Sequence, residues 1–242
     1  MRVAVISDIH ANLHALEAVL SAIDSESPDE VWCLGDVVGY GPHPNRCCQQ
    51  VAARASVCLV GNHDLGALGT LSLEAFSPDA AAACRWTRAE IDPDVHDYLA
   101  DRQPLLRRPD AELYHASPRD PVWDYVLSEH AALESLALTT APVVLVGHSH
   151  VPLAITVENG SFAGGLAPAG TEVELGGTRW LLNPGSVGQP RDGDRRAAWL
   201  LVDLAAGRAS FRREEYPVAQ TQAEILARGL PDVLAARLGT GQ

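Results

Sequence analysis

Five short apolar runs in the sequence each lead into residues that commonly bind metal ions. The runs cover residues 3–6, 31–34, 57–60, 111–114 and 143–146. The polar residues that follow them are, in the same order, Asp8 and His10, Asp36, Asn62 and His63, His115, and His148 and His150. Carboxylate, amide and imidazole groups together favour borderline ions such as Mn, Fe, Zn, Co or Ni over Ca.

The runs themselves indicate how these residues are positioned. Apolar runs of this length are typical of buried strands in an α/β sheet. Ligands of open α/β folds bind beyond the carboxyl ends of the strands, so five separate segments point polar groups at one place. Each segment also has an ordinary interpretation: Asp8 could cap a helix, Asp36 could be a turn carboxylate, and His115 could be a hydrogen-bonded strand residue. All five ordinary interpretations would have to hold at once.

In type and order, these motifs resemble the calcineurin-like metallophosphoesterases. That family has the pattern DxH, GDxxxxG, GNH(D/E), a single His after a strand, and GHxH. The sequence contains DIH at 8–10, GDVVGYG at 35–41, GNHD at 61–64, His115, and GHSH at 147–150. The resemblance spans residues 1 to about 190, and NPGSVGQPR at 183–191 is similar to the small bacterial and archaeal phosphodiesterase branch.

The resemblance implies a set of roles for these residues. It implies that one divalent metal ion is held by Asp8, His10 and His150, that a second is held by Asn62, His115 and His148, and that Asp36 bridges the two. It further implies that a metal-bridging hydroxide attacks phosphorus in line. His63 would then be catalytic, protonating or stabilising the leaving oxygen.

One position departs from the protein-phosphatase branch of the family. The pattern GDxVDRG supplies an Asp that orients the catalytic His and an Arg that binds phosphate, whereas this sequence has Gly39 and Tyr40 there. A phosphoprotein substrate is therefore disfavoured, and the residue that orients His63 is left open. Asp64 is a candidate for the outer hydrogen bonds that metal ligands need.

Substrate contacts have weaker signals in the sequence. Arg191 could clamp a phosphate through its planar guanidinium, or be an ordinary surface residue. Tyr40 could line the pocket or pack, and His43 could contact substrate or face solvent. Trp123 and Tyr125 could stack on a base or anchor the helix that follows them.

Composition limits the classes of function. The chain has 242 residues, of which 47% are hydrophobic and 20% charged, and it fits a single metallophosphoesterase domain over 1–242. A net charge of −13 disfavours stable nucleic-acid binding. Five irregularly spaced cysteines argue against a secreted disulfide framework. With no apolar run long enough to span a membrane and no signal peptide, we expect a cytoplasmic protein.

The remaining pattern predicts the architecture. Helices are expected at 13–24, 44–53, 78–90, from 92–93, at 128–138, 218–227 and 231–238. Hairpins are expected around Asn159-Gly160, between 172–175 and 178–182, and between 197–203 and 209–216, with a surface loop at 162–170. Early βα units and later hairpins fit the four-layer α/β/β/α sandwich of two mixed sheets with flanking helices, which ends in a C-terminal hairpin and helices from about 197.

These observations predict a dinuclear metal-dependent phosphoesterase. Its substrate is expected to be a small or nucleotide-like phosphodiester. A phosphomonoesterase or protein phosphatase is the alternative within the enzyme class. A non-catalytic metal-binding scaffold of the same fold is the alternative outside it, although every ligand position of the family pattern is filled.

Overall fold

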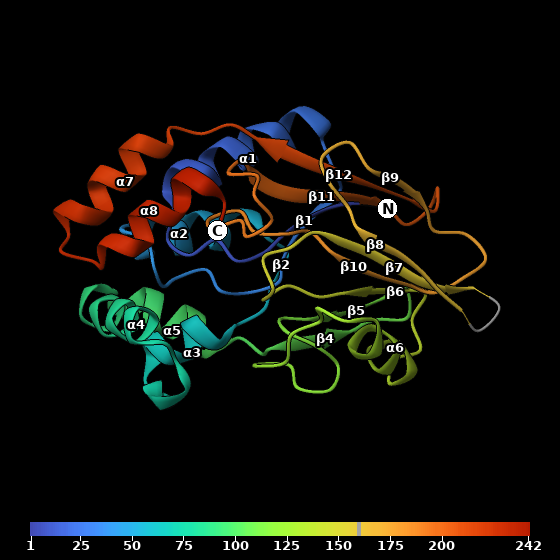
Figure 1. Cartoon of the computed structure of the whole chain (residues 1–242), viewed down its shortest axis with the longest axis horizontal. Helices are drawn as coiled ribbons and strands as arrows, with labels where there is room; N and C mark the ends of the chain where they lie inside the picture. Colours follow the sequence, from blue (N-terminus) through green and yellow to red (C-terminus); the bar gives the residue numbers. More distant parts are fainter. Residues whose placement is uncertain (159–160) are drawn as a thin grey trace.

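Two mixed six-stranded sheets face each other in the described part of the chain, with helices on their outer surfaces (Figure 1). The computed structural model describes residues 1–158 and 161–242. Within these residues there are eight α-helices and one short 3₁₀ helix. The expected α/β/β/α sandwich is therefore confirmed.

The first sheet joins the N-terminal strands to the C-terminal hairpin. Its strands are, in spatial order, β3 (Val57–Cys58), β2 (Glu30–Cys33), β1 (Arg2–Ile6), β11 (Ala197–Asp203), β12 (Arg208–Glu214) and β9 (Glu172–Glu174). Strands β1, β2 and β3 run parallel, and β11 continues the sheet antiparallel to β1. The three ligand-bearing loops that follow β1, β2 and β3 thus leave the sheet at the same edge.

The second sheet is built around three parallel strands. Its strands are, in spatial order, β4 (Leu105–Arg107), β5 (Ala111–Tyr114), β6 (Val143–Leu145), β10 (Trp180–Asn183), β7 (Leu153–Glu158) and β8 (Ser161–Leu166). Strands β5, β6 and β10 run parallel. The segments after them carry His115, His148 and the 183–191 loop to one edge.

Alternating side chains of the strands divide the core into layers. In β1, Val3 and Val5 belong to the core between the two sheets, and Ala4 and Ile6 pack toward the first helices. On the second sheet, Leu113 faces the first sheet and Tyr114 packs in a separate core with residues near α6. Successive side chains of a strand point to opposite faces of the sheet, and here both faces are buried. The central strands are therefore continuous apolar runs.

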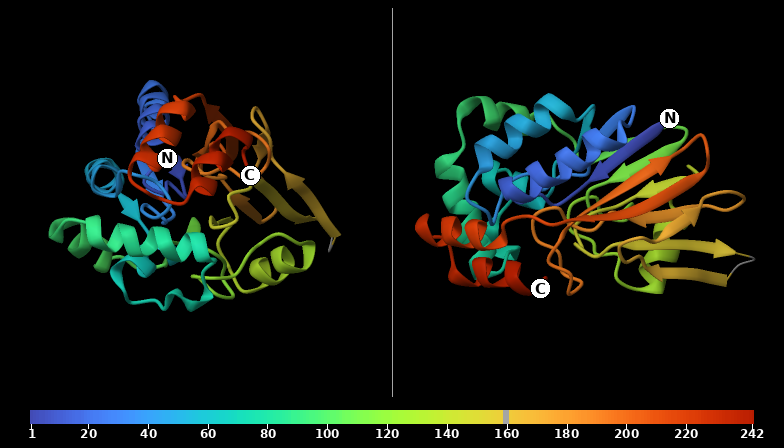
Figure 2. Two further views of the ribbon diagram at one scale, coloured as in Figure 1. Left: turned by 60° about the vertical axis from the view of Figure 1, so that its left-hand side comes forward. Right: turned by 90° about the horizontal axis from the view of Figure 1, so that it is seen from above.

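Helices cover the outer faces and one end of the sandwich. They are α1 (Leu13–Glu26), α2 (Pro44–Arg54), α3 (Asn62–Leu68), the 3₁₀ helix η1 (Leu73–Ala75), α4 (Pro78–Glu90), α5 (Pro93–Ala100), α6 (Glu129–Ala137), α7 (Val218–Ala227) and α8 (Asp232–Thr240). Figures 1 and 2 show α7 and α8 at the end of the molecule that also carries α3, α4 and α5, opposite the tip of β7 and β8. None of the helices in the described ranges is long and apolar enough to cross a membrane.

Helix α3 and strand β4 were not predicted from the sequence, and two expected connections differ from the prediction. Residues 161–166 form β8, paired with β7, so the expected surface loop at 162–170 was wrong over its first half. The expected hairpin between 172–175 and 178–182 was also wrong, because β9 pairs with β12 while β10 pairs with β6 and β7 in the other sheet. Both strand pairings depend on distant partners that a local pattern does not reveal. The turn expected at Asn159-Gly160 lies outside the described residues.

Candidate metal centre

The loops that follow the parallel strands of both sheets meet around Asp8. The backbone N–H of Asp8 donates to Gly35 O (3.0 Å), and Gly188 N–H donates to Asp8 O (3.0 Å). His148 N–H donates to Oδ2 of Asp8 at 3.0 Å, which ties the loop after β6 to the loop after β1. The convergence expected from the five apolar runs is therefore present.

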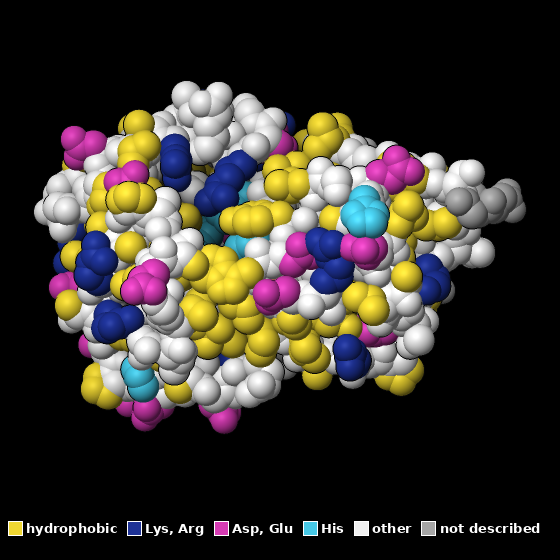
Figure 3. Space-filling model, turned by 60° about the horizontal axis from the view of Figure 1, so that its bottom comes forward, with side chains coloured by type: hydrophobic (Ala, Val, Ile, Leu, Met, Phe, Trp, Pro, Cys, Tyr) yellow, Lys and Arg dark blue, Asp and Glu magenta, His cyan; other side chains and the backbone are white. Residues whose placement is uncertain are grey.

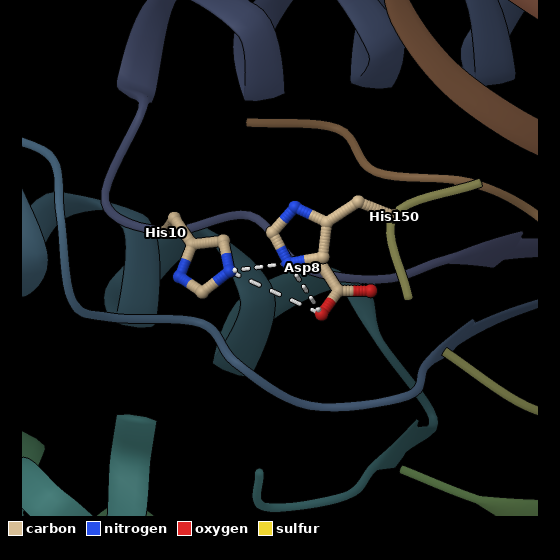
Figure 4. A group of neighbouring side chains, drawn as sticks. All are labelled: Asp8, His10 and His150. Atoms are coloured by element: carbon tan, nitrogen blue, oxygen red, sulfur yellow. Dashed lines mark hydrogen bonds and ion pairs between the residues drawn. The ribbon is translucent and has the colours of Figure 1, made fainter. Parts of the chain in front are cut away.

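One cluster combines Asp8, His10 and His150, all of them buried (Figure 4). The Nε2 atoms of His10 and His150 are 3.1 Å apart. Nε2 of His150 is 3.4 Å from Asp8 Oδ1, and Nε2 of His10 is 4.0 Å from the same oxygen. Three potential ligand atoms thus surround one small volume.

The hydrogen bonds on the far side of each ring fix its tautomer. Nδ1 of His10 is 3.2 Å from Val38 O, and Nδ1 of His150 is 2.6 Å from Gln189 O. A carbonyl oxygen only accepts, so Nδ1 carries the hydrogen in both rings and Nε2 presents a lone pair. Two lone pairs 3.1 Å apart repel each other unless a cation lies between them, and metal-ligating histidines are oriented by such outer bonds.

A second cluster combines Asp36, His115 and His148, with Asn62 beside them. Nδ1 of His115 donates to Leu34 O (3.0 Å), so its Nε2 lone pair faces Asn62 Oδ1 at 3.2 Å. Oδ2 of Asp36 is 3.6 Å from His10 Nε2 and 3.7 Å from His115 Nε2. This oxygen therefore lies between the two clusters, where a bridging ligand would be needed.

The donor set fits divalent metal ions. Among the described residues, Asp8 Oδ1, Asp36 Oδ2 and His148 Nε2 are buried atoms without a hydrogen-bond partner. Buried polar atoms are normally satisfied, and three unpaired atoms that face one volume fit the coordination of a cation. Carboxylate oxygen and imidazole nitrogen are the ligands that borderline transition metals prefer.

Backbone strain is concentrated in the same loops. Asp8, His10, Asp36, His148 and His150 all have positive φ, between 49° and 62°. This region is disfavoured for residues with a Cβ, and strained residues cluster at functional sites. Each of these five residues, which lie in three loops, is a candidate ligand.

Burial controls the charges of the cluster. It raises the pKa of Asp8 to about 7 and that of Asp36 well above its usual value. It lowers the pKa of His115 to about 4 and that of His148 to about 3. The imidazoles are accordingly neutral near pH 7, as metal ligands must be, and a bound cation would favour the ionised carboxylates.

His63 forms a third possible ligand group with His10 and Asp36, and it also has contacts that the other candidates lack. Its backbone N–H donates to Asp36 Oδ1 (2.9 Å), and its ring packs against Tyr40 with centroids 4.2 Å apart. Nδ1 is 3.5 Å from the Sγ atom of Cys84 on α4. A Cβ on Gly39 would lie 2.7 Å from Nδ1, so the glycine makes room for the ring where the protein-phosphatase pattern has Asp. No motif or spacing in the sequence marks Cys84, so its contact with His63 could not be predicted.

Asp64 and Gly61 hold the loop around Asp36. The carboxylate of Asp64 accepts from Val38 N–H (2.9 Å) and Gly61 N–H (3.0 Å). A Cβ on Gly61 would lie 2.1 Å from Asp36 Oδ1. Asp64 therefore holds the backbone on both sides of Asp36; its support of the metal ligands stays a prediction.

The weaker candidates are divided between two places. Arg191 donates to Gln189 Oε1 (3.0 Å) and lies near the Tyr40 hydroxyl. The ring of Tyr40 contacts the ring of His10, with centroids 4.6 Å apart. His43 instead pairs with Glu224 on α7 at 2.6 Å. The first two candidates thus adjoin the clusters, and His43 is bound to a helix beside them.

Aromatic residues form another wall of the site. Tyr125 is stacked on His148 with ring centroids 4.0 Å apart and is 44% exposed. Trp123 lies edge-on to Phe76 at 4.9 Å. Figure 3 shows a hollow with histidine at its depth, basic side chains on one rim and hydrophobic side chains on another. An exposed ring above a candidate ligand leaves a flat apolar surface for substrate.

This combination of fold and site defines a metallophosphoesterase, and comparison with known proteins agrees. The family model of the calcineurin-like phosphoesterase superfamily domain matches residues 1–207. The chain therefore belongs to this superfamily. A solved metallophosphoesterase from Sphaerobacter thermophilus is 40% identical, with a TM-score of 0.90 over 100% of this chain and 99% of that one. The sequence-based assignment of the family is therefore confirmed.

Two curated proteins are also similar to the chain. An uncharacterized protein of Methanocaldococcus jannaschii is 35% identical over 99% of this chain and 98% of its own length. A symmetrical bis(5'-nucleosyl)-tetraphosphatase of Shewanella baltica is 30% identical over 152 residues, which are 55% of this chain and 50% of that protein. The second similarity covers only about half of each protein.

Proposed function

We propose that the protein hydrolyses a phosphodiester of a small or nucleotide-like substrate with two divalent transition metal ions. The observation that carries this proposal is the convergence of unpaired acceptors on Asp8, Asp36 and His148 from both sheets. Buried polar atoms are usually hydrogen-bonded, and here three without a partner belong to the same group of carboxylates and imidazoles. Membership of a phosphoesterase superfamily supports hydrolysis as the reaction.

The residues divide naturally between two ions. One ion would be held by Asp8, His10 and His150, the other by Asn62, His115 and His148, and both by Asp36. Such a pair would supply an activated water nucleophile and neutralise charge on the phosphoryl oxygens. The Nδ1–H bonds to carbonyl groups keep the ligand rings in the required tautomer.

His63 would act on the leaving oxygen. Burial lowers its pKa well below the usual value, so the ring is neutral near pH 7. If the Cys84 thiol donates to Nδ1, the single ring hydrogen lies on Nε2. The neutral ring would then donate a hydrogen bond from Nε2 as negative charge develops on the departing group.

Two observations support a diester over a phosphoprotein monoester. Gly39 and Tyr40 occupy the positions of the Asp and Arg in the protein-phosphatase pattern, and packing against His63 requires the glycine. The tetraphosphatase relative acts, by its name, on a bis(5'-nucleosyl) tetraphosphate and not on a phosphoprotein. This supports a nucleotide-like substrate.

Hydrolysis of a substrate panel tests the proposal. Metal-free protein would be reconstituted with Mn, Zn or Co and assayed with bis-nitrophenyl phosphate and nitrophenyl phosphate. We expect metal-dependent turnover, with a higher kcat/KM for the diester. Preference for the monoester across several leaving groups would refute the diesterase assignment, and metal binding without turnover of either would favour a scaffold.

A further inference from the structure

A groove of about 680 Å³ opens beside the candidate metal centre. Most of its lining residues are not part of the family motifs. Its walls come from three separate parts of the chain. The lining residues are Tyr40, Arg191, Val233, Ala236, Arg237, Thr240 and Gln242. Most of them belong to α8 or follow it, beyond the residues 1–207 that match the family description.

Tyr40 connects this groove to the site of the proposed chemistry. Its ring lies 4.6 Å from the ring of His10 and 4.2 Å from that of His63, measured between centroids. The Tyr40 side chain therefore touches both a candidate ligand and the candidate catalytic residue. A substrate whose scissile phosphate lies at the metal centre can extend over Tyr40 into the groove.

Helix α8 presents a different face to the groove than to the core. Val233, Ala236, Arg237 and Thr240 are spaced by three, one and three residues, so they share one face of the helix. The other face packs in a core that also contains Tyr40, through Leu234, Ala235 and Leu238. The core contacts fix the helix, and Arg237 is thereby held at the groove.

The two arginines of the groove lack acidic partners. Among the described residues, Arg191 and Arg237 take part in no ion pair, whereas Asp192 pairs with Arg213 and Asp194 pairs with Arg196 at 2.6 Å. The carboxylates of the neighbouring loop are therefore neutralised by other residues. Arg191 and Arg237 leave two uncompensated positive charges at the groove, in a protein whose net charge is −13.

We propose that this groove binds a second phosphate group of the substrate, between Arg191 and Arg237. The inference rests on the proposed function. It makes the substrate a nucleotide-like compound with at least two consecutive phosphates, one bound at the metal centre and one bound in the groove. Guanidinium groups suit this role because they bind phosphate through two parallel hydrogen bonds.

Binding of two non-hydrolysed probes tests the groove without relying on turnover. The Kd values of AMP and of α,β-methylene-ADP would be measured by calorimetry on the manganese-loaded protein. We expect the wild-type protein to bind α,β-methylene-ADP about 10-fold tighter than AMP or more. In Arg237→Ala the ratio should fall markedly while the affinity for AMP is retained, with the remaining preference due to Arg191. Arg237→Lys should lie between the two, because it keeps the charge but loses the planar fork.

Arg228→Ala is the matched control. Arg228 lies at the end of α7, pairs with Glu90 at 3.8 Å and does not line the groove, so the ratio should stay at its wild-type value. Equal affinity of the wild-type protein for both probes, or an unchanged ratio in Arg237→Ala, would overturn the inference. If the ratio behaves as expected but bis-nitrophenyl phosphate is not hydrolysed, the proposed reaction fails and the groove assignment stands.

Discussion

Replacement of Gly39 by alanine separates backbone strain from a steric contact with His63. Gly39 has φ +89°, and an added Cβ would lie 2.7 Å from His63 Nδ1 and 2.9 Å from His63 Cβ. A left-handed residue with a Cβ costs about 1–2 kcal/mol relative to glycine. Overpacking of a buried site costs about 1–3 kcal/mol more. We therefore expect Gly39→Ala to lower the free energy of unfolding by about 2–5 kcal/mol.

Gly170 offers a matched control for the strain alone. It has φ +85°, and a Cβ there would meet nothing within 4 Å. Gly170→Ala should therefore lose only about 1–2 kcal/mol. Denaturant unfolding of both variants measures the difference, which is the cost of the contact with His63.

Activity gives a second and independent measurement. If the alanine displaces His63, turnover should fall toward the level of a protein without this side chain, a loss of about 10²–10⁴-fold. The metal content should not change, because His63 is not a proposed ligand. Equal destabilisation by the two alanines would refute the packing argument, and a destabilised Gly39→Ala protein with wild-type turnover would refute the displacement of His63.

Four other predictions follow from the same contacts. Asp36→Asn should weaken both metal sites, which elemental analysis checks; a fully loaded and active variant would refute the bridge. His63→Ala should keep its metal and lose less turnover on nitrophenyl esters than on esters with poor leaving groups; metal depletion would instead make His63 a ligand. Arg191→Ala should raise KM more than it lowers kcat, as loss of ground-state binding does. Cys84, which is buried, should resist thiol reagents at pH 8 in the native protein, since burial raises its pKa to about 12 and the thiol stays protonated; rapid labelling of Cys84 would contradict this.

The sequence was sufficient for the positions of the candidate ligands. Each candidate ligand follows a buried strand, and the carboxyl ends of parallel strands lie at the same edge of a sheet. The apolar runs therefore determined the convergence of Asp8, Asp36 and His148 before any distance was known. The helices were similarly predictable, because α1 and α4 begin at capping residues Asn12 and Ser77.

The sequence was insufficient where long-range pairing decides the structure. Strand β8 is a glycine- and alanine-containing segment that forms only because β7 pairs with it. The glycines at 176–177 resemble a hairpin turn but connect strands of different sheets. The groove face of α8 also escaped prediction, because it has a function only when the helix lies beside Tyr40 and Arg191.

The strain at the ligand turns explains how the site keeps its geometry. Left-handed conformations at Asp8, His10 and Asp36 are individually unfavourable, yet each is held by several independent bonds. Asp8 alone accepts through its backbone oxygen from Gly188 N–H (3.0 Å) and Ser186 Oγ–H (2.7 Å), and through Oδ2 from His148 N–H (3.0 Å). These bonds leave Oδ1 without a hydrogen-bond partner. The same network that compensates for the strain therefore presents one free carboxylate oxygen to the cluster, so the protein prepares the site before a cation binds.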